Sequence, residues 1–224
     1  MKKIFSLTLA MALMIFFTAC GSSAQNSENK TSAQATSSTA AENKSTAESA
    51  DAAKKILVVF FSRTGEEYSV GNITKGNTHI VADFIAENLG AKTFEIKPVN
   101  PYPDNYNDCT ELAKKEQQER ARPAIANKID NFDSYDVIYL GYPVWWSDMP
   151  MIIYTFLESY NFSGKTIIPF CTSASEHFIG KEEIQQYANG ATVLDGLGIQ
   201  GKRCQDDPAS VKRDVDNWLK KING

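Results

Sequence analysis

Hydroxyl, glycine and amide residues follow the most apolar segment of the sequence and could hold a phosphate group. The apolar segment at residues 55–61 leads into residues 62–65 (Ser-Arg-Thr-Gly), which offer two hydroxyls, a flexible glycine and backbone N–H groups. Backbone N–H groups that lead toward a helix N-terminus bind anions. Asn77 and Thr78 are types that cap helix N-termini and also donate side-chain hydrogen bonds. An ordinary turn would explain residues 62–65 equally well, so their position after the apolar segment is what favours a phosphate site.

Two further segments carry unusual side chains. Residues 142–146 are Tyr-Pro-Val-Trp-Trp, and residues 171–175 are Cys-Thr-Ser-Ala-Ser. Two adjacent tryptophans in a loop are costly to expose unless they stack against another group, although they could also fold back as a lid on the core. A phosphate-binding turn, an aromatic clamp and a small polar loop together suit a ligand with a phosphate at one end and a flat heterocycle at the other.

The elements that must position these segments alternate along the chain. Apolar, β-branched segments predict strands at residues 55–61, 93–96, 136–141, 166–170 and 191–194. Helical periodicity predicts helices at residues 77–89, 105–120, 149–160, 181–187 and 208–222. Pro169 is unusual in a strand and is expected near the strand end. This alternation predicts an α/β fold with a parallel sheet between helices, whose ligands bind beyond the carboxyl ends of the strands.

The order of these segments resembles the flavodoxin family. The matching motifs are Phe-Ser-Arg-Thr-Gly at 61–65, Asn-Thr at 77–78, Gly-Tyr-Pro-Val-Trp-Trp at 141–146 and Phe-Cys-Thr-Ser at 170–173. The similarity covers nearly all of residues 55–224 and is closest to the exported bacterial lipoprotein branch, which shares the Pro-Tyr-Pro and Tyr pattern of residues 101–106. The resemblance implies a flavodoxin-like three-layer α/β/α sandwich, a five-stranded parallel sheet of order 2-1-3-4-5, and FMN as the cofactor.

The resemblance also implies which residues contact FMN. The expected cofactor-binding residues are Ser62, Arg63, Thr64, Gly65, Asn77 and Thr78 around the phosphate, Pro143, Val144, Trp145 and Trp146 along the isoalloxazine, and Thr172, Ser173 and Ala174 at the ring edge or ribityl chain. No residue is assigned a catalytic role.

Residues 66–76 depart from the family pattern, in which the phosphate loop runs straight into its helix. Glu66 and Glu67 would repel a phosphate dianion if they pointed inward. We therefore expect this insert to fold outward or over the flavin.

The N-terminal residues resemble a bacterial lipoprotein signal. Lys2 and Lys3 precede an apolar run of about 14 residues, which is shorter than the roughly 20 that span a membrane. Small residues before Cys20 resemble a lipobox, so we expect a signal peptide at residues 1–19 and lipidation of Cys20. An ordinary secretory signal is the alternative. Residues 20–53 contain no aromatic residue and predict a disordered tether to a folded domain at residues 54–224.

The remaining cysteines are Cys109, Cys171 and Cys204. No pair of them has metal-ligand spacing, so no metal site is expected. Buried or free thiols and a Cys171–Cys204 disulfide are both compatible with the sequence.

Net charge limits the partners. The formal charge is −4 and becomes more negative when a signal containing two lysines is removed. This acidic balance argues against nucleic acid as a partner. It also leaves the acyl chains expected on Cys20 as the membrane attachment. The expected function is electron transfer at the extracytoplasmic face of a bacterial cell membrane, with a redox protein or a quinone-like small acceptor as partner. An FMN-dependent NAD(P)H:quinone-type reductase and a non-redox ligand-binding lipoprotein remain alternatives; the lack of an NAD(P)H fingerprint favours the carrier.

Overall fold

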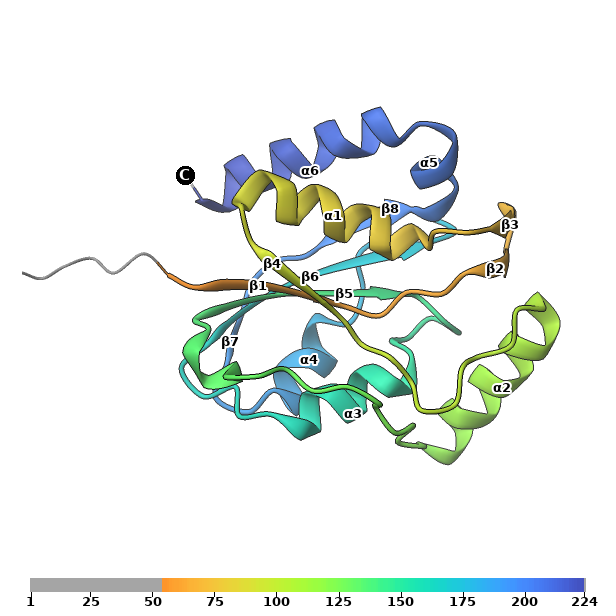
Figure 1. Ribbon diagram of the computed structural model, residues 1–224, viewed down its shortest axis with the longest axis horizontal. Helices are drawn as coiled ribbons and strands as arrows, with labels where there is room; N and C mark the ends of the chain where they lie inside the picture. Colours follow the sequence, from red (N-terminus) through yellow and green to blue (C-terminus); the bar gives the residue numbers. More distant parts are fainter. Residues whose placement is uncertain (1–53, 224) are drawn as a thin grey trace, which may run out of the picture. The chain divides into compact units, whose positions relative to one another are not determined.

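The computed structural model describes residues 54–223. The predicted signal peptide, Cys20 and the tether therefore lie outside the described residues. Within them, one central sheet separates two layers of helices (Figure 1). The α/β class predicted from the alternating elements is confirmed.

The middle layer is a six-stranded parallel sheet. Its strands are β4 (Lys92–Glu95), β1 (Ile56–Phe60), β5 (Val137–Pro143), β6 (Thr166–Ser173), β7 (Thr192–Val193) and β8 (Leu197–Gln200). The order β4-β1-β5-β6-β7 corresponds to the predicted 2-1-3-4-5, and every pair in it is parallel. The prediction of five strands is one short, because β8 also pairs with β6, beyond the end of β7.

Pro169 lies in the middle of β6, so the expectation that it sits near the strand end is wrong. Its position explains how a central strand tolerates it. β7 pairs with residues 166–167 and β8 pairs with residues 170–173, so the outer neighbour of β6 changes at the proline. Proline has no N–H group to donate, so it fits at the gap between the β7 and β8 hydrogen-bond ladders.

Helices cover both faces of the sheet. One layer holds α1 (Asn77–Leu89), α5 (Gly201–Asp206) and α6 (Pro208–Asn223), and the other holds α2 (Tyr106–Glu119), α3 (Met151–Ser159) and α4 (Lys181–Tyr187), with the short 3-10 helix η1 (Phe132–Ser134) (Figure 1). α1 ends where predicted, because Gly90 adopts the left-handed conformation that closes a helix. Among residues 54–223, no helix combines the length and apolar character of a membrane span.

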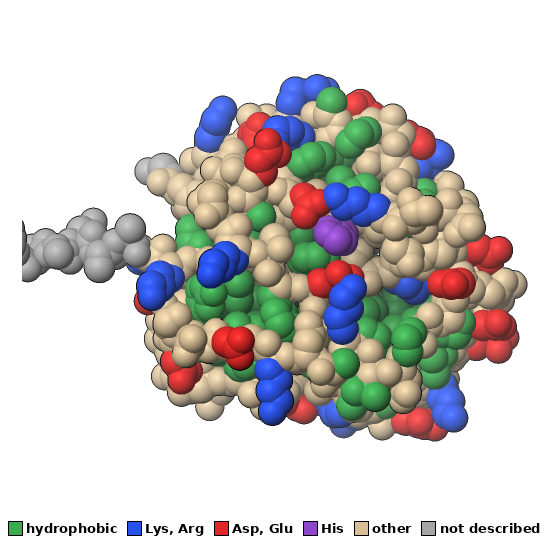
Figure 2. Space-filling model, in the orientation of Figure 1, with side chains coloured by type: hydrophobic (Ala, Val, Ile, Leu, Met, Phe, Trp, Pro, Cys, Tyr) green, Lys and Arg blue, Asp and Glu red, His purple; other side chains and the backbone are tan. Residues whose placement is uncertain are grey.

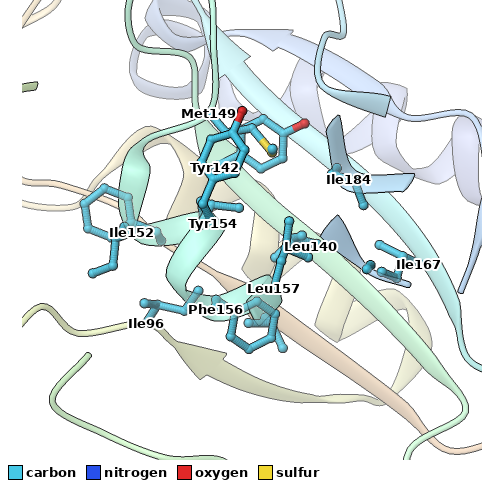
Figure 3. Packing of buried hydrophobic residues seen from close by; sticks show 14 of the residues in the cluster. Ile96, Leu140, Tyr142, Met149, Ile152, Tyr154, Phe156, Leu157, Ile167 and Ile184 are labelled. Atoms are coloured by element: carbon cyan, nitrogen blue, oxygen red, sulfur yellow. The ribbon is translucent and has the colours of Figure 1, made fainter. Parts of the chain in front are cut away.

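The core consists of two clusters, one on each face of the sheet. Along β5, Ile138 and Leu140 belong to one cluster, whereas Val137 and Tyr139 belong to the other. Side chains alternate between the faces of a strand, so a strand covered on both sides is apolar throughout. Figure 3 shows Leu140 beside Leu157 and Phe156 of α3. This packing fixes β5, whose carboxyl end carries the two tryptophans.

Candidate functional site

A pocket of about 300 Å³ lies at the carboxyl ends of β1, β5, β6 and β8. This volume is at the lower end of the range of ligand sites. The sequence-predicted residues that line it are Ser62, Arg63, Asn77, Thr78, Pro143, Val144, Trp145, Trp146, Thr172, Ser173 and Ala174. Thr64 and Gly65 do not line it; they line a neighbouring hollow together with Asp104 and Asn105. Three segments that are distant in the sequence thus share one pocket.

The N-terminus of α1 forms one end of the pocket. Gly76 precedes the helix without a side-chain cap, and no acidic residue lies in the first turn. The His79 N–H donates to Ser62 Oγ at 3.2 Å. Among the described residues, no group accepts a hydrogen bond from the N–H of Asn77 or Thr78. Uncapped N–H groups and the positive end of the helix dipole attract an anion here.

The insert leaves this end of the pocket intact because Gly76, its last residue, lies against Ser62, which precedes the insert. A Cβ on Gly76 would lie 3.1 Å from Ser62 Cβ and closer still to Ser62 Oγ. Only glycine permits this approach, which brings Ser62 beside the start of α1 as an uninterrupted loop would.

Neighbouring elements hold the first residues of α1 in place. Asn77 Oδ1 accepts a hydrogen bond from Gln205 Nε2 at 2.8 Å, which leaves the Asn77 NH₂ group as the remaining donor. Gly201 makes room for this amide, since a Cβ there would lie 2.8 Å from Asn77 Nδ2. The buried Thr78 and Thr172 hydroxyls lie 2.8 Å apart and join α1 to β6.

The two tryptophans point in different directions. Trp145 packs edge-on against Phe61 and Tyr102, with ring centroids 5.5 and 4.9 Å apart. Trp146 and Ser147 have φ angles of 51° and 59°, and Trp145 and Asp148 exchange backbone hydrogen bonds across them. Such a two-residue turn reverses the chain tightly. It directs Trp145 toward the core and leaves Trp146 49% exposed at the pocket mouth.

The insert forms a hairpin of β2 (Gly65–Glu67) and β3 (Gly71–Ile73). Its tip, residues 67–70, lines the pocket. The Glu66 carboxylate accepts hydrogen bonds from the Tyr106 N–H and from Asn105 Nδ2, at 3.0 and 2.9 Å, so it turns toward the N-terminus of α2. This contact answers the concern that Glu66 would repel a phosphate.

Arg63 and Glu67 form an ion pair at the pocket wall, with Nε and Oε1 3.0 Å apart. Burial raises the pKa of Glu67, and the Arg63 charge opposes that shift. Arg63 also donates to the carbonyl oxygens of Pro103, Asp104 and Glu66. Its guanidinium therefore joins the hairpin to the loop before α2.

Several lining residues were not anticipated from the sequence. They are Glu67, Tyr68, Ser69 and Val70 of the hairpin, Tyr106, Cys109 and Thr110 of α2, and Gln200, Gly201 and Lys202 after β8. Large apolar residues at 197 and 199 alternate with Gly198 and Gln200, and this alternation could have indicated strand β8. No signal in the polar α2 sequence distinguished its pocket-facing residues.

The three described cysteines are free and buried, so no Cys171–Cys204 disulfide forms. Burial raises the pKa of Cys109 and of Cys171 to about 11, and that of Cys204 to about 12. All three are therefore neutral thiols near pH 7. Residues 54–223 contain no group of three or more His, Cys, Asp or Glu side chains arranged to hold a metal ion.

Known structures resemble this chain over nearly their full length. A putative flavoprotein from Bacteroides eggerthii DSM 20697 is 28% identical, with a TM-score of 0.60; the match covers 76% of this chain and 98% of that one. A putative flavoprotein from Bacteroides uniformis ATCC 8492 is 32% identical, with a TM-score of 0.58, and the match covers 73% of this chain and 98% of that one.

A flavoprotein from Lactobacillus acidophilus NCFM, described in complex with FMN, shares the fold. It is 22% identical with a TM-score of 0.51, and the match covers 70% of this chain and 99% of that one. No curated protein sequence matches this chain. A family model described as flavodoxin matches residues 55–222, and the chain therefore belongs to the flavodoxin family.

Proposed function

We propose that the pocket binds FMN and that the protein uses this flavin in electron transfer. The observation that carries the proposal is one pocket with an aromatic wall at one end and a helix N-terminus at the other, where the N–H groups of Asn77 and Thr78 have no acceptor among the described residues. A flavin with a phosphate tail needs both features. The fold shared with an FMN-containing flavoprotein from Lactobacillus acidophilus supports the assignment.

The residues present fit the parts of FMN. The N–H groups of Asn77 and Thr78, together with Ser62 Oγ, suit the phosphate. Pro143, Val144 and Trp145 provide the apolar wall that a flat ring needs. When bound, FMN supplies the redox chemistry, while the protein orients it and sets its electrostatic surroundings.

Purified protein mixed with excess FMN is expected to remain yellow after gel filtration, with flavin absorbance in the protein peak. A Trp145→Ala variant should retain less flavin, because it removes apolar surface from the ring wall. Protein that elutes colourless would overturn the FMN proposal. Unchanged FMN affinity in Trp145→Ala would show that this side chain does not contact the ring.

We further propose that Cys20 carries the lipid that attaches this domain to the extracytoplasmic face of a bacterial membrane. The apolar run that precedes Cys20 and the polar segment that follows it support the proposal. The full chain expressed in a bacterial host is expected to incorporate radioactive palmitate and to sediment with membranes. A Cys20→Ala variant should lose the label; a labelled variant would refute lipidation at this residue.

A further inference from the structure

Exposed lysines without an ion pair are concentrated at one end of the domain. Eight exposed lysines form no ion pair with another residue of the range 54–223. Two of them are on α2, and the other six lie at the end of the domain where the described chain begins and ends (Figure 1): Lys54, Lys55, Lys92, Lys128, Lys220 and Lys221. Figure 2 shows basic side chains (blue) beside the start of β1 and acidic ones (red) gathered at the opposite end. The chain is acidic overall, yet this end of the domain carries positive charge.

A hollow of about 650 Å³ lies among four of these lysines. Lys54 and Lys55 precede β1, Lys92 begins β4, and Lys128 lies in the segment between α2 and η1. Because β1 and β4 are parallel neighbours, their amino ends bring the first three of these lysines to one edge of the sheet. Like charges held together without acidic partners attract an anion from outside the protein.

Apolar side chains line the hollow between the lysines. Four that are only partly buried are Ile56, Leu89, Phe94 and Ile129. Acidic groups are few here: among the lining residues Asp130 alone carries a carboxylate, and the carboxylate of the adjacent Asp136 accepts the Lys55 backbone N–H at 2.8 Å. Lysine itself combines an apolar stem with a charged end. An apolar hollow with ammonium groups around it therefore suits a molecule that carries phosphate next to hydrocarbon.

The hollow and the proposed FMN pocket lie at opposite edges of the sheet. The register of β1 and β4 places Lys92 beside Leu57, near the amino end of β1. Ser62 and Thr172 line the pocket, and they follow β1 and lie near the carboxyl end of β6. The part of the chain that contains Cys20 joins the domain at Lys54, which lines the hollow. A lipid on Cys20 would therefore be tethered to the edge that carries the lysines.

We propose that this basic end docks on the headgroups of anionic phospholipids, with lipid phosphates held among the lysines of the hollow. Charge complementarity and the place where the chain enters the domain select this occupant, because each lysine close to an anionic membrane surface adds to the attraction. The inference rests on the lipid attachment proposed at Cys20, which raises the concentration of headgroups near this end. The expectation that only acyl chains attach the protein followed from net charge, which does not report how charge is distributed.

Docking has a consequence for the orientation of the domain. Since the hollow and the pocket lie at opposite edges of the sheet, binding of the hollow to headgroups turns the pocket away from the bilayer. The pocket then opens toward the aqueous phase, where the acidic end of the domain is also directed (Figure 2). Repulsion between that acidic end and anionic headgroups favours the same orientation.

The contact is tested with the full-length lipidated protein reconstituted in vesicles, by the rate at which an uncharged reagent acetylates each lysine. Lys92 and Lys128 are expected to react about fivefold more slowly in vesicles of equal parts phosphatidylcholine and phosphatidylglycerol than in phosphatidylcholine alone, because anionic headgroups cover them. Lys115 on α2 is the internal control and should react at the same rate in both. Equal rates for Lys92 in the two vesicles would overturn the docking. Protein that associates with neither vesicle would instead overturn the lipid attachment at Cys20.

Charge reversal identifies the surface. In the double variant Lys92→Glu, Lys128→Glu, the protection of Lys54 and Lys55 by phosphatidylglycerol should be lost to within twofold. The matched control Lys115→Glu, Arg213→Glu makes the same change in formal charge at exposed positions elsewhere, and it should keep the protection. None of these four positions lines the FMN pocket, so FMN affinity and the thermal midpoint should stay the same in both variants.

Salt provides a second measurement on the parent protein. Raising the ionic strength from about 0.1 M to about 1 M shortens the Debye length from about 10 Å to about 3 Å, which should abolish most of the protection. Protection that survives in Lys92→Glu, Lys128→Glu, or that is lost equally in the matched control, would overturn the assignment of this surface.

Discussion

Replacing Asn77 by Asp is expected to weaken FMN binding about 100-fold without unfolding the protein. Asn77 is the first residue of α1 and lines the pocket where the helix N-terminus would meet the phosphate. The substitution conserves shape but places a carboxylate against a dianion. Two like charges about 4 Å apart near a protein surface repel by up to roughly 4 kcal/mol. A 100-fold change corresponds to about 2.7 kcal/mol, which allows for screening.

The fold should tolerate this substitution. The introduced carboxylate would still accept the hydrogen bond that Gln205 Nε2 donates to Asn77 Oδ1, and a carboxylate in the first turn interacts favourably with the helix dipole. The thermal midpoint of the apoprotein is therefore expected to stay the same or rise slightly, as measured by circular dichroism.

Riboflavin provides the matched control, because it has the same ring and ribityl chain without the phosphate. Its dissociation constant, measured by quenching of flavin fluorescence, should change less than twofold in Asn77→Asp. If riboflavin and FMN binding weaken equally, the phosphate does not lie at the N-terminus of α1. The penalty for FMN should also shrink near pH 5, where a phosphate monoester carries less charge.

Most of the sheet could be predicted because the central strands carry their own signal. β1 and β5 are buried on both faces, so their sequences are apolar without interruption. β8 lacked an uninterrupted apolar sequence. It has only four residues, and two of them, Gly198 and Gln200, are not large apolar residues. Its place is determined by pairing with β6 beyond Pro169, which is a long-range contact that local periodicity does not report.

The pocket could be predicted to the extent that it follows strand ends. Ser62, Trp145 and Thr172 each lie just beyond or at the end of a central strand, and parallel strands bring their carboxyl ends to one edge. The sequence led to the expectation that the insert folds outward or over the flavin, but it did not predict the β-hairpin or the partners of Glu66 and Glu67. The positions of both side chains depend on partners far along the chain. Glu66 accepts a hydrogen bond at the N-terminus of α2, and Glu67 pairs with Arg63, which in turn donates to the loop before α2.

Substituting Gly141 by Ala is expected to destabilise the apoprotein by about 2–3 kcal/mol, within the range for overpacked cores. Gly141 lies in β5 between Phe60 of β1 and Phe170 of β6. A Cβ at this position would lie 2.9 Å from Phe170 Cε1 and closer still to Cζ and Cε2 of the same ring, which is itself fully buried. Because a domain of this size loses about 2–4 °C per kcal/mol, the thermal midpoint should fall by roughly 4–12 °C.

A second substitution, on the neighbouring strand β6, tests whether the clash with Phe170 causes the loss of stability in Gly141→Ala. Phe170→Leu removes the ring atoms that the new methyl group would meet, at a cost on the order of 1 kcal/mol by itself. The double variant should then be more stable than the sum of the single effects by about 1–2 kcal/mol, a coupling typical of residues in contact. Additive losses would mean that the methyl group does not meet the ring. Since β5 ends at Pro143, two residues before Trp145, relief of this clash should also restore any FMN affinity lost in Gly141→Ala.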